Sequence, residues 1–180
     1  MTRDRVAHDT QLLIDFLNTN AMGRLPDRLD DPEVQLKIVF SFVPAFRGES
    51  VNRSTVRHLR RLRAALFAVI NSRDTLAAHA AWNALNGLAA GVSYRYRFTK
   101  PSSVELAQIH GDRTIGAIVA CAARAMRADS WDRVKVCARE RCNAVFYDAT
   151  RSRTRRWHSY ARCGNAANVA ACRRRQRSHR

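Results

Sequence analysis

Two pairs of metal-binding residue types near the C-terminus constrain this chain more than any other feature. Cys137 and Cys142 are separated by four residues and, after fifteen intervening residues, His158 and Cys163 repeat that spacing. Zinc prefers thiolate and imidazole donors in a closed tetrahedron, and two closely spaced pairs on separate turns can supply them. We therefore expect one structural zinc ion. A closed set of four protein ligands leaves no position for a reactive water, so the pattern does not indicate a zinc enzyme.

Short apolar segments around these pairs predict how the zinc-binding region folds. Residues 134–136 and 145–147 would form a hairpin whose turn carries the first ligand pair. Residues 164–172 follow the second pair and predict a helix. A metal that pins a hairpin to a helix is a common solution where the apolar core alone is too small to fold. We expect Cys172 to be a spare thiol and Cys121 to belong to the core of the preceding region.

Positive charge is concentrated in the same region. The chain has 32 Lys and Arg against 15 Asp and Glu, a net charge of +17. Residues 137–180 hold twelve arginines against Glu140 and Asp148, so a quarter of the chain carries more than half of the excess. Such a field attracts polyanions and does not determine the fold. We expect nucleic-acid contacts from eight arginines: Arg151, Arg153, Arg155, Arg156, Arg162, Arg173, Arg174 and Arg177.

Three further side chains of this region have two interpretations each. Trp157 and Tyr160 would form a small core beside the metal or stack on bases. Asp148 would pair with Arg155 or Arg156 and thereby fix the loop between the ligand pairs. The arginine-rich tail would either extend the helix or form a disordered arm that binds polyanions.

The first 132 residues predict a mainly helical domain. Apolar residues at three- and four-residue spacing indicate helices over residues 52–70, 74–89 and 112–128, with Asp74 as the cap of the second. We expect five arginines to occupy the solvent face of the first of these helices: Arg53, Arg57, Arg60, Arg61 and Arg63.

The remaining segments of this domain are shorter. Residues 9–22 fit a helix or a buried strand, and their length favours the helix. Residues 23–32 contain Gly and Pro among charged residues and predict a loop. Residues 92–98 alternate as a half-buried strand does, and residues 104–110 would be their hairpin partner.

The predicted fold class is mainly α, with an α+β character. A helical N-terminal domain with one short β-hairpin would span residues 1–132, and a small zinc finger of hairpin and helix would span residues 133–180. We expect the two parts to pack together, because no Gly/Ser linker separates them. The chain begins with polar residues, and its five cysteines are then expected as reduced thiols or metal ligands in the cytoplasm, with no membrane partner. No heptad seam indicates an oligomeric state.

Two stretches resemble known families. Residues 155–165 (Arg-Arg-Trp-His-Ser-Tyr-Ala-Arg-Cys-Gly-Asn), which follow Phe-Tyr-Asp-Ala-Thr-Arg at 146–151, are similar to the CGNR zinc finger. Residues 13–19 (Leu-Ile-Asp-Phe-Leu-Asn-Thr) are similar to the start of the ABATE domain that usually precedes this finger. The resemblance implies a bacterial, stress-responsive transcription regulator that binds DNA through the finger. It also implies the zinc ligands Cys137, Cys142, His158 and Cys163.

The chain departs from the CGNR pattern at two positions. The fourth residue of the Cys-Gly-Asn-Arg motif is Ala166 here, and Asn168 replaces a lysine often found two positions later. Two basic groups at the start of the expected helix are therefore missing. We expect zinc binding to be retained and DNA contacts to differ.

A DNA-binding transcriptional regulator is the function that these observations favour. The alternative is a sequence-nonspecific RNA- or polyanion-binding zinc protein, which the arginine-rich tail favours. A small-molecule effector of the N-terminal domain is a further hypothesis, because Asp15, Asn18 and Thr19 are polar residues in an apolar segment that could line a pocket or satisfy a helix end. An enzyme is not expected, since no nucleophile and base are suitably spaced. A thiol redox sensor that releases zinc on oxidation is the remaining rival.

Overall fold

The computed structural model describes residues 3–22, 25–72, 76–100, 103–128 and 130–178. Over these residues the helices are α1 (Arg3–Leu17), α2 (Pro32–Phe42), α3 (Arg53–Asn71), α4 (Leu76–Ala89), α5 (Arg113–Arg127) and α6 (Asn165–Ser178). Two antiparallel hairpins pair β1 (Ser93–Lys100) with β2 (Ser103–His110) and β3 (Val134–Val136) with β4 (Val145–Tyr147). Short helical turns lie at η1 (Arg28–Asp30), η2 (Trp131–Arg133) and η3 (Tyr160–Gly164). The predicted fold class, mainly α with short hairpins, is confirmed.

Helices α1 to α5 form the body of the protein, and side-chain caps explain where three of them begin. The carboxylate of Asp31 accepts a bond from the second residue of α2, and the Asn52 side chain accepts one from the third residue of α3. Asp112 caps α5 in the same way. Each such cap satisfies a backbone N–H that has no partner inside its helix and contributes about 1 kcal/mol. Asp74, the expected cap of α4, lies outside the described residues.

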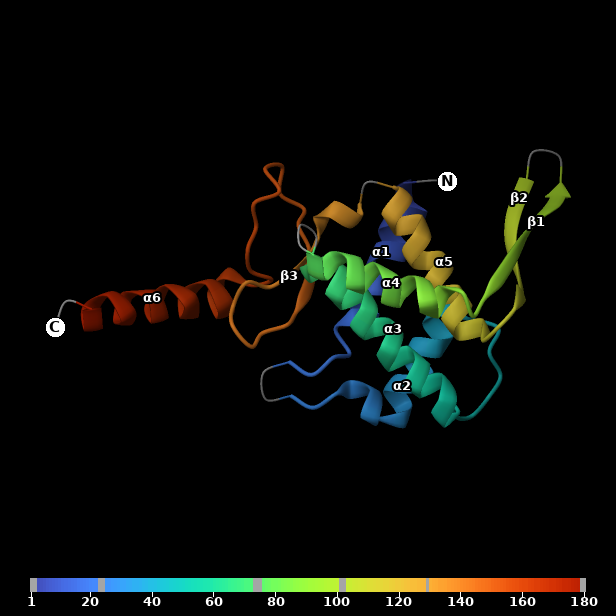
Figure 1. The fold of residues 1–180 in the computed structure, drawn as a ribbon, viewed down its shortest axis with the longest axis horizontal. Coiled ribbons are helices and arrows are strands. Elements are labelled where there is room, and N and C mark those ends of the chain that lie inside the picture. Colours follow the sequence, from blue (N-terminus) through green and yellow to red (C-terminus); the bar gives the residue numbers. More distant parts are fainter. Residues whose placement is uncertain (1–2, 23–24, 73–75, 101–102, 129, 179–180) are drawn as a thin grey trace.

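One apolar core joins the helices that precede residue 130 to the second hairpin, β3–β4. Helices α1, α3 and α5 pack against one another, and α4 lies along α3 (Figure 1). Phe16, Leu62 and Ile118 are among their fully buried side chains. Val134 of β3 and Val145 of β4 belong to the same cluster, which places the hairpin against α1 and α3. The expectation that the two parts pack together is confirmed.

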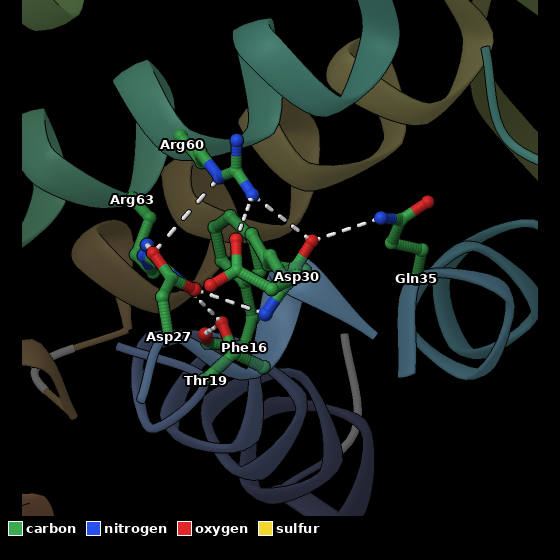
Figure 2. A network of polar contacts seen from close by, with 8 residues as sticks. Phe16, Thr19, Asp27, Asp30, Gln35, Arg60 and Arg63 are labelled. Atoms are coloured by element: carbon green, nitrogen blue, oxygen red, sulfur yellow. Dashed lines mark hydrogen bonds and ion pairs between the residues drawn. The ribbon is translucent and has the colours of Figure 1, made fainter. Parts of the chain in front are cut away.

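Arg63 is buried, and the expectation that it faces solvent is wrong. Only 4% of the residue is exposed, and both of its terminal nitrogens bind the carboxylate of Asp27 (Figure 2). Arg63 Nη1 also donates to Thr19 Oγ1 at 2.8 Å, and that hydroxyl donates to the Phe16 carbonyl. Burial raises the pKa of Asp27, but the hydrogen bonds and the charge of Arg63 outweigh burial. The net pKa is lowered, so the carboxylate is held ionised. The pair ties the segment after α1 to α3.

Asn18 connects the end of α1 to the second hairpin. Its Nδ2 donates to the Val145 carbonyl at 2.9 Å, and its Oδ1 accepts from the Val145 N–H at 2.8 Å. The carboxamide therefore pairs with the outer edge of β4 as a neighbouring strand would. Asp15 is exposed and accepts a bond from Gln11 instead. Of the two interpretations of this polar segment, the satisfied helix end describes Thr19, whose hydroxyl binds the Phe16 carbonyl, whereas the Asn18 side chain binds β4.

The β1–β2 hairpin projects from the body on the side opposite α6 (Figure 1). Its base is held on α5, because the Tyr94 hydroxyl donates to the Gly116 carbonyl at 2.6 Å. The Gln108 amide adds bonds to the carbonyls of the turn that precedes α5. Residues 95–99 of β1 are exposed, so the half-buried strand expected for residues 92–98 holds only at Val92 and Tyr94.

In the part of the chain that the structure describes, every helix falls short of the length and apolar character needed to cross a bilayer.

Replacing Asn18 with alanine is expected to lower the free energy of unfolding by about 2–3 kcal/mol, because the buried peptide groups of Val145 lose their partner. Urea unfolding of the zinc-loaded protein, followed by circular dichroism, measures the change. Asn83→Ala on the exposed side of α4 is the matched control and should change stability by less than about 0.5 kcal/mol. Equal effects of the two substitutions would contradict the connecting role of Asn18.

Candidate metal centre and basic surface

Four side chains with metal-ligand chemistry meet beside the second hairpin. The donor atoms of Cys137, Cys142, His158 and Cys163 all lie within 4.8 Å of one another. Cys142 Sγ is 3.7 Å from Cys163 Sγ, and His158 Nδ1 is 3.4 and 3.6 Å from these two sulfurs. Tetrahedral zinc with Zn–S near 2.3 Å and Zn–N near 2.0–2.1 Å would separate two sulfurs by about 3.8 Å and sulfur from nitrogen by about 3.6 Å. The distances fit zinc, with Nδ1 as the imidazole donor.

The turn between β3 and β4 shapes the first half of this cluster. Arg141 and Asn143 adopt left-handed backbone conformations with φ of 63° and 56°, which turn the chain tightly around the sulfurs. The Cys137 N–H closes the turn by donating to the Ala144 carbonyl at 2.8 Å. Backbone N–H groups also donate to the sulfurs of both cysteines. Such bonds stabilise thiolates, which are the form that binds zinc.

The acid–base properties of the cluster also suit a metal. Burial raises the pKa of the Cys142 thiol to about 12, and the neighbouring sulfurs contribute. Burial lowers the pKa of His158, and the charges of Arg155, Arg162 and Arg139 lower it further. The imidazole is therefore held neutral with a lone pair available. A bound cation stabilises the thiolate form of these crowded thiols, so metal binding releases their protons.

Aromatic and apolar side chains surround the cluster. Phe146 and Ala144 pack with the buried cysteines, and Trp157 and Met22 cover them. Met22 comes from the segment after α1, so the body supplies part of this small core. Tyr160 is exposed and contacts Trp157 edge to face, at 5.9 Å between ring centroids. The core interpretation therefore describes Trp157, whereas the Tyr160 ring is accessible.

Asp148 organises the loop between the two ligand pairs from a fully buried position. Its carboxylate accepts bonds from Lys135 Nζ at 2.7 Å, from the Thr150 hydroxyl and N–H, and from the Arg155 N–H at 2.9 Å. Burial raises the pKa of Asp148, but these donors outweigh burial and hold it well below its usual range. The expected side-chain pair with Arg155 or Arg156 is wrong. Lys135 is the charged partner because β3 and β4 place it beside Asp148.

The eight predicted arginines fall into three groups. Six are exposed: Arg151, Arg153, Arg156, Arg162, Arg173 and Arg174. Arg155 is exposed but engaged, since it lies over the Phe146 ring at 5.1 Å and donates to the carbonyls of Trp157 and His158. The Arg177 side chain lies outside the described part of the chain.

Sequence reasoning missed Arg139, which lies beside the cluster. Its Nη1 donates to the Arg162 carbonyl at 3.2 Å and lies 3.9 Å from Cys163 Sγ. A cation here offsets the negative charge of three thiolates around one zinc ion. The sequence contained a signal for this role of Arg139. It follows Cys137 by two residues, in the turn between the first two ligands, which must fold back over the metal cluster.

The C-terminal helix starts directly from the second ligand pair. The Ser159 hydroxyl accepts a hydrogen bond from the Arg162 N–H, and the Ser159 carbonyl accepts one from the Cys163 N–H. The metal ligand Cys163 therefore lies in η3, the helical turn that leads into α6. Helix α6 continues from this turn to Ser178 and extends away from the body (Figure 1). Of the two interpretations of the arginine-rich tail, the helical one describes it as far as Ser178.

Two family models match the chain. Residues 133–176 match the CGNR zinc finger, and residues 10–130 match ABATE, described as "putative stress-induced transcription regulator". The chain belongs to the ABATE family. This ABATE protein carries a zinc finger, and its cofactor is zinc. Both resemblances found in the sequence are confirmed, and neither matched family is described as an enzyme. No curated protein matches the chain.

Elemental analysis of this ABATE protein, purified without chelators, is expected to find about one zinc per chain. Cys142→Ser should lose the metal and part of the helical circular dichroism, because α6 follows directly from the ligand turn. Cys172→Ser, in an exposed position on α6, is the control and should retain both. Zinc affinity should fall as the pH is lowered, since protons compete for the thiols. A metal-free protein with its helical signal intact would contradict the assignment.

Asp148→Asn is expected to lower the free energy of unfolding by about 3 kcal/mol, because it removes one partner of a buried ion pair. It should also speed zinc release to a chelator, since the loop that leads to His158 loses its central acceptor. Glu140→Gln in the same finger is the control, because that carboxylate is 87% exposed. Zinc release at the same rate from both variants would show that Asp148 does not support the metal site.

Proposed function

We propose that this zinc-binding regulator binds duplex DNA through its finger. In the proposed division, residues 1–132 form the regulatory body and residues 133–180 form the finger. The proposed metal ligands are Cys137, Cys142, His158 and Cys163. The observation that carries the proposal is the position of α6, an acid-free helix that starts at the metal cluster and extends into solvent with exposed arginines.

The dimensions of α6 support insertion into a groove. Fourteen residues at 1.5 Å each give a rod about 21 Å long, and an α-helix with side chains is about as wide as the major groove of B-DNA. Arg173 and Arg177 are four residues apart and share one face of the helix. Arginine binds phosphate oxygens or guanine O6 and N7 with two parallel hydrogen bonds. The helix can therefore combine positioning with base recognition.

The loop between the ligand pairs supports a second set of contacts. Asp148 and Lys135 fix its backbone, and Arg155 bonds within the loop. We assign Arg155 to positioning, and the exposed Arg151 and Arg153 to phosphate. A loop that is already ordered loses less conformational entropy on binding.

The two departures from the family pattern place DNA contact further along the helix. Ala166 is partly buried, and Asn168 Nδ2 lies 3.4 Å from the Tyr160 hydroxyl, to which it donates. The first turn of α6 therefore faces the finger itself. In the proposal, base contact depends on residues from Arg173 onward.

The double variant Arg173→Ala/Arg174→Ala is expected to weaken binding to a selected duplex about tenfold and to reduce the salt dependence of binding by about two phosphate contacts. Arg53→Ala/Arg57→Ala is the control: it removes the same charge from exposed positions on α3, and its effect should be smaller. The duplex comes from genome-wide selection with the wild-type protein, and fluorescence anisotropy at several salt concentrations gives the affinities.

A comparison of nucleic acids separates the proposal from its alternative. Random duplex and single-stranded RNA of the same length are measured beside the selected duplex. Equal affinity for all three, with the same salt dependence, would establish a general polyanion binder and overturn sequence-specific regulation. A motif that Cys163→Ser still selects would show that the finger is not the reader.

A further inference from the structure

The β1–β2 hairpin has one apolar face that continues outward from the body. Tyr94 and Gln108 pair across the strands and bind the start of α5, so their face of the hairpin is the one directed at the body. Tyr96 pairs with Leu106, and Phe98 pairs with Val104, on the same face because side chains alternate along a strand. The polar face carries Arg95 and the ion pair of Arg97 with Glu105.

The outer part of this face is too large and too exposed for an isolated hairpin. Its four residues are exposed by 70% at Tyr96, 79% at Phe98, 54% at Val104 and 53% at Leu106. These fractions leave roughly 500 Å² of apolar surface, near the upper end of the largest patch on an ordinary monomer. A two-stranded hairpin is marginally stable without a packed face. A partner is therefore expected to cover it.

The receiving surface lies on the same molecule. Between the apolar face and α5 is a groove of about 860 Å³, and Ala120 and Ala123 form its helical wall. Their short side chains leave room for large ones. Arg124 and Arg127 line the same groove. The molecule thus presents large apolar side chains on the hairpin and a hollow with an alanine wall beside them.

We propose that a second copy of this chain covers the face, with the two hairpins exchanged across a twofold axis. Phe98 of each copy would fill the groove of the other. A twofold interface needs one surface that is complementary to itself, and the adjacent hairpin and groove provide it. Two such faces bury roughly 1,000 Å² before the groove walls are counted, which reaches the range of specific interfaces.

Charge favours a second copy at this face over other faces. At a net charge of +17 two copies repel, but the four outer side chains are uncharged, so the hairpin brings no further cation to Arg124 and Arg127 of the facing groove.

Sedimentation velocity of the full-length, nuclease-treated, zinc-loaded protein tests the proposal without DNA. We expect a concentration-dependent species of twice the 20.4 kDa chain mass. Phe98→Glu should raise the dissociation constant on the order of 100-fold, because it places a charge at the centre of the apolar face. Thr99→Glu, an exposed neighbour on the opposite face with the same charge change, should leave the dimer intact. A monomer at all concentrations, or a dimer that Phe98→Glu does not affect, would overturn the proposal.

A photo-crosslinking amino acid at position 98 tests the geometry in the otherwise unaltered protein. Mixed ¹⁴N- and ¹⁵N-labelled copies are irradiated, and the crosslinked peptides are identified by mass spectrometry. We expect crosslinks between differently labelled copies, from position 98 to the α5 segment around Ala120 and Ala123. Crosslinks within one copy only, or to a copurified molecule instead of a second copy, would overturn the exchanged arrangement.

Discussion

The finger depends on burial of its hairpin in the core of the body. Val134 and Val145 contribute to the same cluster as the helices, and the Asn18 carboxamide pairs with the outer edge of β4. The body in turn supplies Met22 to the small core around the metal cluster. The β3–β4 hairpin thus packs against both the core of the body and the small core around the metal cluster. Any change that separates the body from the finger exposes both, so we expect the two to unfold cooperatively.

Buried ion pairs fix two loop segments. Arg63 and Asp27 hold the chain after α1, and Lys135 and Asp148 hold the chain before His158. A buried charge is tolerated only when its partner and its hydrogen bonds are in place. Each pair therefore selects a single conformation of its loop. In both cases a carboxylate in a loop binds a cation on a regular element, which transfers the rigidity of a helix or hairpin to the loop.

Periodicity and ligand spacing predicted most of the fold and all four residues of the metal cluster. Helices have a three- to four-residue apolar repeat, and zinc requires particular atoms at short range, so both leave a signal in local sequence. The errors concern partners that are distant along the chain. The local sequence does not distinguish Arg63 from its exposed neighbours on α3, because its partner Asp27 is distant along the chain. Asp148 binds Lys135 because of strand register, and the exposure of Phe98 depends on how far β1 extends past α5.

The turn that holds Cys163 also fixes the rotation of α6 about its own axis. Each residue of an α-helix advances by about 100° around that axis, so the direction of every arginine relative to the metal is set by its distance in sequence from the ligand. One residue inserted after Gly164 would turn the whole arginine face by more than a quarter of a circle without altering composition or charge. The number of residues between Cys163 and the arginines therefore decides in which direction the basic groups point from the metal cluster.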